Sequence, residues 1–157
     1  MKALFIGDAV GVAGCEFLRQ RLIGLKMQYE ADLVIVNGEN SAQGNGITPA
    51  SAKMILSSGA DVITTGNHAF KQRESVQVFN MRNVLRPANF SDEVIGKGLY
   101  YHDSGYARTA VINIMGTVFM DSLDNPFVCI DRILEIADTP NIIVDFHAEA
   151  TSEKKAF

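Results

Sequence analysis

The sequence predicts an α/β protein whose first half contains a parallel sheet. Short apolar segments alternate there with longer segments of helical character, and this order requires parallel strands joined by crossover helices. The composition agrees, because 47% of the residues are hydrophobic and 20% are charged, as in ordinary globular proteins. A chain of 157 residues suits one domain with a substantial core, so we expect residues 1–157 to form a single domain.

Three strands and two helices are expected in the first half. The strands are short, mostly apolar runs at residues 3–6, 33–36 and 61–64. The first helix is expected at residues 15–29, with an uneven apolar stripe formed by Phe17, Leu18, Leu22, Leu25 and Met27. The second helix starts with Thr48 as its N-cap and Pro49 as its first helical residue, and Gly59 closes it after Ser58.

The second half has a less regular pattern. We expect helices at residues 71–80 and 127–137, and strands at residues 98–101, 107–114, 117–120 and 141–144. The first two of these strands are predicted to pair through a turn, Asp103-Ser-Gly-Tyr106. The segment after the last strand, which contains Glu149, Thr151 and Glu153, is interpreted as a solvated loop.

Charge and cysteine content narrow the function classes. The net charge of −4 does not favour binding to nucleic acid or to an anionic membrane surface. A small phosphorylated substrate remains compatible with it, because a bound metal can reverse the local charge. Cys15 and Cys129 have no metal or redox spacing, and the sequence does not start with a signal peptide, so we expect a cytoplasmic protein. No apolar run reaches the roughly 20 residues that a membrane span needs.

Polar side chains follow four of the predicted strands at the points where these strands end. They are Asp8, Glu39, Asn40, Asn67, His68 and, after the late strand, His147. In open α/β sheets the carboxyl ends of parallel strands line the ligand crevice, so residues far apart in sequence can meet on one rim. Oxygen and nitrogen donors of this kind suit Mn²⁺, Fe²⁺ or Zn²⁺. Gly44 and Gly46 lie in the loop that follows, which we expect to leave the rim open.

Each of these residues also has a purely structural interpretation. Asp8 could cap the next helix, and Asn40 and Asn67 could stabilise turns. His68 and His147 could be partly buried histidines with satisfied hydrogen bonds. The shared position after successive apolar strands favours a site, because neither capping nor turn formation requires that arrangement.

A dinucleotide-binding loop is the competing interpretation of residues 7–14. The segment Gly7-Asp-Ala-Val-Gly11-Val-Ala-Gly14 follows a strand and precedes a helix. Its glycine spacing differs from G-x-G-x-x-G, and Asp8 stands where a pyrophosphate would approach. An acidic side chain there repels phosphate and attracts metal, which argues against a nicotinamide-dependent reductase.

Five sequence blocks together resemble a known family. They are "GDAVG", "NGENSAQGNGIT", "SGADVITTGNHAF", "RPANF" and "DFHAEATSEK", and they extend over the chain from Leu4 to Lys154. In this order they resemble the bacterial metallophosphoesterases that include the YmdB phosphodiesterases. The resemblance implies a calcineurin-like α/β/β/α sandwich that hydrolyses 2′,3′-cyclic and 3′,5′-cyclic nucleotides, with a small phosphodiester as its substrate and a homo-oligomeric assembly.

The resemblance also implies a dinuclear metal centre, with Fe or Mn, or else Zn, as the metal. Asp8, Glu39 and Asn40 would bind one ion, and Glu39, Asn67 and His147 would bind the other, so that Glu39 bridges the two. His68 would be the general acid. Such a pair of ions can hold both phosphoryl oxygens and activate the attacking water.

The sequence departs from the family pattern in three ways. Val10 stands at the histidine position of the wider superfamily's Asp-x-His, a feature that the YmdB group shares. After His68 the group continues Thr-Trp-Asp, whereas this chain has Ala-Phe-Lys, so the substrate rim is expected to differ. The family also continues to a Gly-x-His-x-His motif beyond the point matching Phe157. We therefore expect the C-terminal part of the fold to be missing here and this polypeptide alone to be weak or inactive. The alternative is a non-catalytic, nucleotide-binding or regulatory remnant of the same fold.

Overall fold

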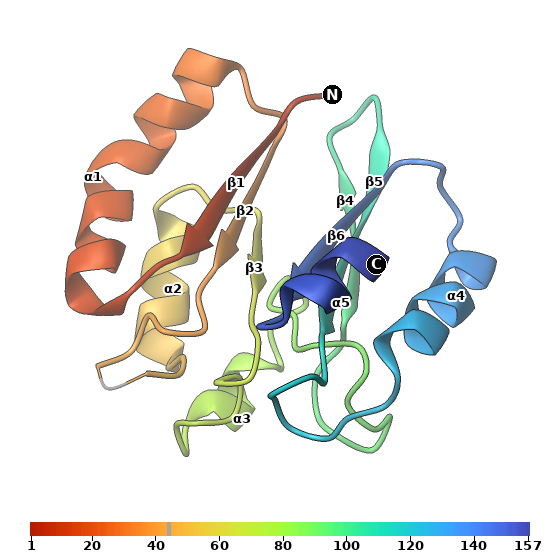
Figure 1. Ribbon diagram of the computed structural model, residues 1–157. Coiled ribbons are helices and arrows are strands. Elements are labelled where there is room, and N and C mark those ends of the chain that lie inside the picture. Colours follow the sequence, from red (N-terminus) through yellow and green to blue (C-terminus); the bar gives the residue numbers. More distant parts are fainter. Residues whose placement is uncertain (44) are drawn as a thin grey trace.

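Two three-stranded sheets pack face to face in the computed structural model, which describes residues 1–43 and 45–157 (Figure 1). The first sheet is parallel, in the order β1 (Ala3–Asp8), β2 (Leu33–Asn37) and β3 (Val62–Thr64). The second sheet is mixed, in the order β4 (Leu99–Asp103), β5 (Arg108–Met115) and β6 (Ile142–His147). Strand β4 runs antiparallel to β5, and β6 runs parallel to it.

Helices cover the outer faces of both sheets (Figure 1). Helices α1 (Gly11–Tyr29) and α2 (Pro49–Ser57) lie on the first sheet, and α4 (Pro126–Ile136) lies on the second. Two short helices, α3 (Ser75–Val78) and α5 (Thr151–Ala156), follow β3 and β6 in the chain. The layer order is α/β/β/α, which confirms the predicted sandwich.

The apolar core consists of three layers of side chains. One lies between α1, α2 and the first sheet, and another between the second sheet and α4. The layer between the sheets is formed by Leu33, Ile35, Val62, Leu85 and Val111. Strand β2 contributes to both faces of its sheet, and every residue in it is buried. This explains why its sequence is continuously apolar rather than alternating.

The predicted elements are largely confirmed, and the start of α2 is confirmed in detail. Thr48 caps that helix by accepting a hydrogen bond from the backbone N–H of Ser51, and Pro49 follows as predicted. The prediction for α1 was wrong in two respects. The helix begins at Gly11 rather than at residue 15, so the glycines of the supposed loop lie mostly within it. Phe17 and Met27 of the predicted stripe are exposed, and only Leu18 and Leu22 of that stripe are buried.

Three predictions for the second half were wrong. The helix expected at 71–80 is reduced to the single turn of α3. Residues 117–120 form a turn instead of a strand. The segment interpreted as a solvated loop contains α5, in which Glu153 is buried. The last two errors have one cause, because Glu153 accepts hydrogen bonds from the backbone N–H groups of Thr117 and Val118 that strand pairing would use.

Among the described residues, no helix combines the length and the apolar character needed to cross a bilayer. Cys15 and Cys129 are both free thiols. Gly44, one of the two glycines expected in the open loop, lies outside the described residues.

Candidate active site

The carboxyl ends of β1, β2, β3 and β6 meet at one end of the sandwich (Figure 1). The parallel register aligns the strand ends of the first sheet, with Asp8 paired to Asn37 and Asn37 paired to Thr64. All six predicted site residues lie at this end and contact one another: Asp8, Glu39, Asn40, Asn67, His68 and His147. The structure therefore brings together residues from four separate segments of the chain.

The turn after β2 determines where Glu39 lies. The side-chain oxygen of Asn37 accepts a hydrogen bond from the Glu39 N–H at 3.1 Å, which forms an Asx turn. The preceding N–H, that of Gly38, donates to the carbonyl of Thr64 at 3.0 Å and holds the turn against β3. Asn37 thus has a structural role, which the sequence did not reveal among the polar residues following the strand.

Glu39 is the centre of the cluster. Its side chain is 2% exposed, and a carboxylate in such a position is costly unless partners compensate for the lost water. One carboxylate oxygen accepts a hydrogen bond from the His68 backbone N–H at 3.2 Å. The other lies 3.4 Å from His147 Nε2 and 3.7 Å from His68 Nδ1. Both histidine rings therefore face the same carboxylate from different segments.

Asn40 links Asp8 to His68. Its amide Nδ2 donates to Asp8 Oδ2 at 2.7 Å and lies 3.5 Å from Glu39 Oε1. Its amide oxygen lies 2.7 Å from His68 Nδ1 and orients that ring. Asp8 does not cap α1, because the N-cap of that helix is Val10 and no side chain caps it. The structure thus removes the capping interpretation of Asp8.

Gly66 passes close to the side chains of Glu39 and His147. A Cβ atom at this position would overlap with Glu39 Oε2 and with the imidazole ring of His147. Only glycine allows the backbone to pass so close to both side chains. The next residue, Asn67, places its side-chain oxygen 3.0 Å from His147 Nε2. His147 Nε2 therefore faces two oxygen donors, one from Glu39 and one from Asn67.

The donor set fits a divalent cation, although it is unusual in composition. Within residues 1–43 and 45–157, no three His, Cys, Asp or Glu side chains form a group arranged to hold a metal ion. The candidate set depends instead on the amides of Asn40 and Asn67, which are neutral oxygen donors. An amide N–H of Asn40 lies between the carboxylates of Asp8 and Glu39, where positive charge is favoured. Asn40 could ligate a cation there only through its oxygen.

Buried polar groups lie directly beneath the cluster. Asp145 precedes His147 by two residues on the same face of β6, and its Oδ2 atom is buried without a hydrogen-bond partner. Burial raises the pKa of this carboxyl, against the opposing influence of Thr64 and His147. Asn113 connects the two sheets at this level by donating to the backbone carbonyls of Thr65 and Leu85 at 2.8 and 3.2 Å.

One cavity includes a residue of the cluster. A cavity of about 750 Å³ is lined by Asn67, Phe119, Met120, Asp121, Glu149, Ala150 and Thr151. Sequence reasoning placed Phe119 and Met120 in an expected strand and assigned neither of them to the site, because no motif covers them. This cavity opens beside the cluster, so we take it as the space available to a substrate.

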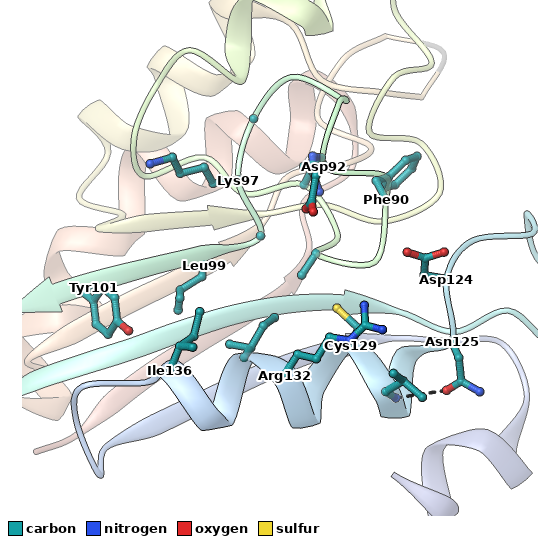
Figure 2. Close-up of a pocket in the computed structure, with 16 residues that line it drawn as sticks. Phe90, Asp92, Lys97, Leu99, Tyr101, Asp124, Asn125, Cys129, Arg132 and Ile136 are labelled. Atoms are coloured by element: carbon teal, nitrogen blue, oxygen red, sulfur yellow. Dashed lines mark hydrogen bonds between the residues drawn. The ribbon is translucent and has the colours of Figure 1, made fainter.

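The larger cavity, of about 920 Å³, lies between the loop before β4, strand β4 and helix α4 (Figure 2). Figure 2 shows Leu99 and Tyr101 of β4 facing Arg132 and Ile136 of α4 across it. None of the six clustered residues lines it. Arg86, which does, donates hydrogen bonds to the backbone carbonyls of Pro87, Ser91 and Val94, so its charge holds the loop. The larger cavity is therefore less suited to the chemistry than the smaller one.

Comparisons with known proteins show which family and structures this chain resembles. The sequence pattern described as YmdB-like protein matches residues 4–157. The chain is 42% identical over 159 residues to a 2′,3′-cyclic-nucleotide 2′-phosphodiesterase of Bacillus subtilis (strain 168). That match covers 99% of this chain and 60% of the relative, so the chain spans well under two thirds of its length.

Solved structures give the same result for the fold. A phosphatase from Mycoplasma pneumoniae is 34% identical with a TM-score of 0.91, covering 99% of this chain and 58% of that one. The NAD nucleotidase of Haemophilus influenzae is only 16% identical, with a TM-score of 0.67 over 98% of this chain and 35% of its own. This second likeness concerns the fold alone and agrees with the predicted calcineurin-like class.

Proposed function

This chain belongs to the YmdB-like protein family, and from that premise we propose that it acts as a metal-dependent phosphodiesterase on 2′,3′-cyclic and 3′,5′-cyclic nucleotides. The observation that supports this most is the convergence of Asp8, Glu39, Asn40, Asn67, His68 and His147 around one buried carboxylate. Capped helices, turns and isolated histidines do not require such a convergence. The phosphodiesterase name of the Bacillus subtilis relative is consistent with the proposal.

The residues would divide into two sets of ligands for two divalent cations, Fe or Mn, or else Zn. Asp8 and Asn40 would hold one ion, Asn67 and His147 the other, and Glu39 would be shared. When bound, these ions would neutralise phosphate charge and supply an activated water. The near-complete burial of Glu39 favours ion binding, since cations would replace the water that its carboxylate has lost.

His68 would deliver a proton to the leaving oxygen of the ribose. Its backbone N–H is held by Glu39 and its Nδ1 by Asn40, so the remaining ring nitrogen, Nε2, is the one available for proton transfer. An alkoxide leaves poorly unless it is protonated, and general-acid catalysis typically contributes about 10²–10⁴-fold. The contact between Nδ1 and the Asn40 amide oxygen restricts rotation of the ring.

A purified sample of the chain tests the proposal with Mn²⁺, 2′,3′-cyclic AMP and product analysis by chromatography. We expect hydrolysis that is weak in this polypeptide, depends on Mn²⁺ and is lost in Glu39→Gln, because this variant removes the charge that both ions would share. Glu135→Gln makes the same change on the exposed face of α4 and should behave as wild type. Elemental analysis should find metal in the wild type and in Glu135→Gln, and a strong reduction in Glu39→Gln.

A nucleotide-binding module without catalysis is the second candidate. It predicts that 2′,3′-cyclic AMP binds without metal and that Glu39→Gln leaves this binding unchanged. That result, together with the absence of hydrolysis, would overturn the phosphodiesterase proposal.

A further inference from the structure

Phe119 is an aromatic side chain exposed at the rim of the smaller cavity. Its side chain is 89% exposed, more than any other large hydrophobic residue in the described part of the chain. Its φ angle is +65°, a left-handed conformation that bulky side chains rarely adopt. Both features cost free energy in the isolated protein, and strained residues of this kind concentrate at ligand sites. A contact with a ligand would explain why Phe119 occupies this position.

The turn that carries Phe119 is held firmly in place. Glu153, which is 6% exposed, accepts hydrogen bonds from the N–H groups of Thr117 at 2.9 Å and Val118 at 3.4 Å. Gly116 precedes the turn, and a Cβ atom there would overlap with the Glu153 carboxylate. The two residues that precede Phe119 are thus anchored by a buried carboxylate.

The same turn is connected to the proposed catalytic cluster. The Gly116 N–H donates to the carbonyl of His147 at 2.9 Å, so the turn begins next to the end of β6. Phe119 lines one cavity with Asn67, whose side-chain oxygen is 3.0 Å from His147 Nε2. At about 750 Å³ the cavity has the size of a small-molecule site, which is typically about 300–1,000 Å³. A ligand bound at Asn67 and His147 would extend toward Phe119.

We propose that Phe119 is the base-binding residue of this site, on which the nucleobase stacks while the phosphate lies at the clustered ligands. This inference rests on the proposed function and assigns the part of the substrate that the metal ligands do not recognise. Every nucleobase has a π face, so a single aromatic platform binds all four bases with little preference. Glu153 is a positioning residue that maintains the platform.

Equilibrium binding tests the inference without relying on turnover. Titration calorimetry with Zn²⁺ present would compare 3′-AMP with ribose 3-phosphate, which carries the same phosphate and no base. We expect Phe119→Leu to weaken the binding of 3′-AMP by about 5- to 150-fold, the range that corresponds to the loss of one stacked base. The affinity for ribose 3-phosphate should not change. Phe119→Tyr should retain most of the 3′-AMP affinity. Phe17→Leu, which alters another exposed phenylalanine on α1, should change neither ligand.

Proton NMR supplies a second readout. Stacking should move the adenine H2 and H8 signals upfield through the ring current, and Phe119→Leu should abolish that shift. Equal 3′-AMP affinity and equal shifts in wild type and Phe119→Leu would overturn the inference, as would an equal loss for both ligands, which indicates a general disturbance of the site. If wild type binds neither ligand, the proposed function itself fails. If it binds both and only the dependence on Phe119 is absent, the stacking role alone is wrong.

Discussion

At the scale of single residues, the site depends on how little space surrounds Glu39. Its carboxylate is compensated by the His68 N–H and faced by the rings of His68 and His147, and the backbone at Gly66 passes against it. In close-packed surroundings a single added methyl group must displace its neighbours. The arrangement is therefore sensitive to side-chain volume at a residue that carries no functional group.

Gly66→Ala tests this sensitivity. The new Cβ would overlap with Glu39 Oε2 and the His147 ring, so we expect a loss of about 1–3 kcal/mol in unfolding free energy and weaker Mn²⁺ binding. Gly24→Ala is the matched control, because a Cβ atom at this position within α1 meets nothing within 4 Å. That variant should be more stable than wild type by about 0.5–1 kcal/mol. Denaturant unfolding and calorimetric Mn²⁺ titration measure both effects, and equal behaviour of the two variants would contradict the argument.

The identity of the clustered residues could be predicted, but their mutual contacts could not. Asp8, Glu39 and Asn67 each follow an apolar strand, and parallel topology alone brings such positions to one rim. The contact of Asn40 with His68 depends on side-chain rotamers, which one sequence does not determine. The role of Gly66 could not be predicted either, since a turn glycine and a glycine in a crowded site look alike in sequence.

At the scale of elements, the short helix α5 stabilises the turn that follows β5. The helix has six residues and a single buried one, Glu153, which supplies the acceptors for the turn after β5. A short polar segment with one buried residue gives no hydrophobic periodicity, which is why this helix was not predicted. The strand expected at residues 117–120 does not form, although its apolar residues suit a strand. The N–H groups of Thr117 and Val118 donate to the carboxylate of Glu153, which is distant in sequence.

Glu153→Ala tests the dependence of the turn on α5. The substitution leaves the N–H groups of Thr117 and Val118 without an acceptor, and we expect it to cost about 1–3 kcal/mol of unfolding free energy. Glu153→Gln retains one acceptor oxygen and should recover part of the loss. Lys154→Ala, at the adjacent exposed position of the same helix, is the control and should have little effect. Urea denaturation of the four proteins compares them, and equal stability of the Glu153 and Lys154 variants would contradict the role.

At the scale of the whole molecule, the second sheet does not cover the first completely. Phe5 of β1 is paired with Ile35, so both point to the space between the sheets. Ile35 is fully buried there, whereas Phe5 is 43% exposed. The inner face of the sandwich is thus closed over β2 and open over β1. An open apolar face of this kind favours association.

Phe5→Gln tests the exposed inner face. We expect this variant to bind less of the dye ANS and to associate less in sedimentation velocity, because it removes the apolar group from the open end of the layer. Phe17→Gln makes the same change on the outer side of α1, at a residue that is 59% exposed, and should affect dye binding less. An equal reduction by both variants would show that exposure alone, and not the inner face, determines dye binding.

The distribution of the clustered residues along the chain has a consequence for folding. Asp8 lies near one end of the described chain and contacts Asn40, whereas His147 lies near the other end and faces Glu39 at 3.4 Å. Contacts of such large sequence separation form late, after loop-closure entropy has been overcome by the pairing of both sheets. No partly folded chain can offer the complete set of donors. An ion that binds the complete set of donors would therefore bind only the folded protein and, by mass action, raise its free energy of unfolding.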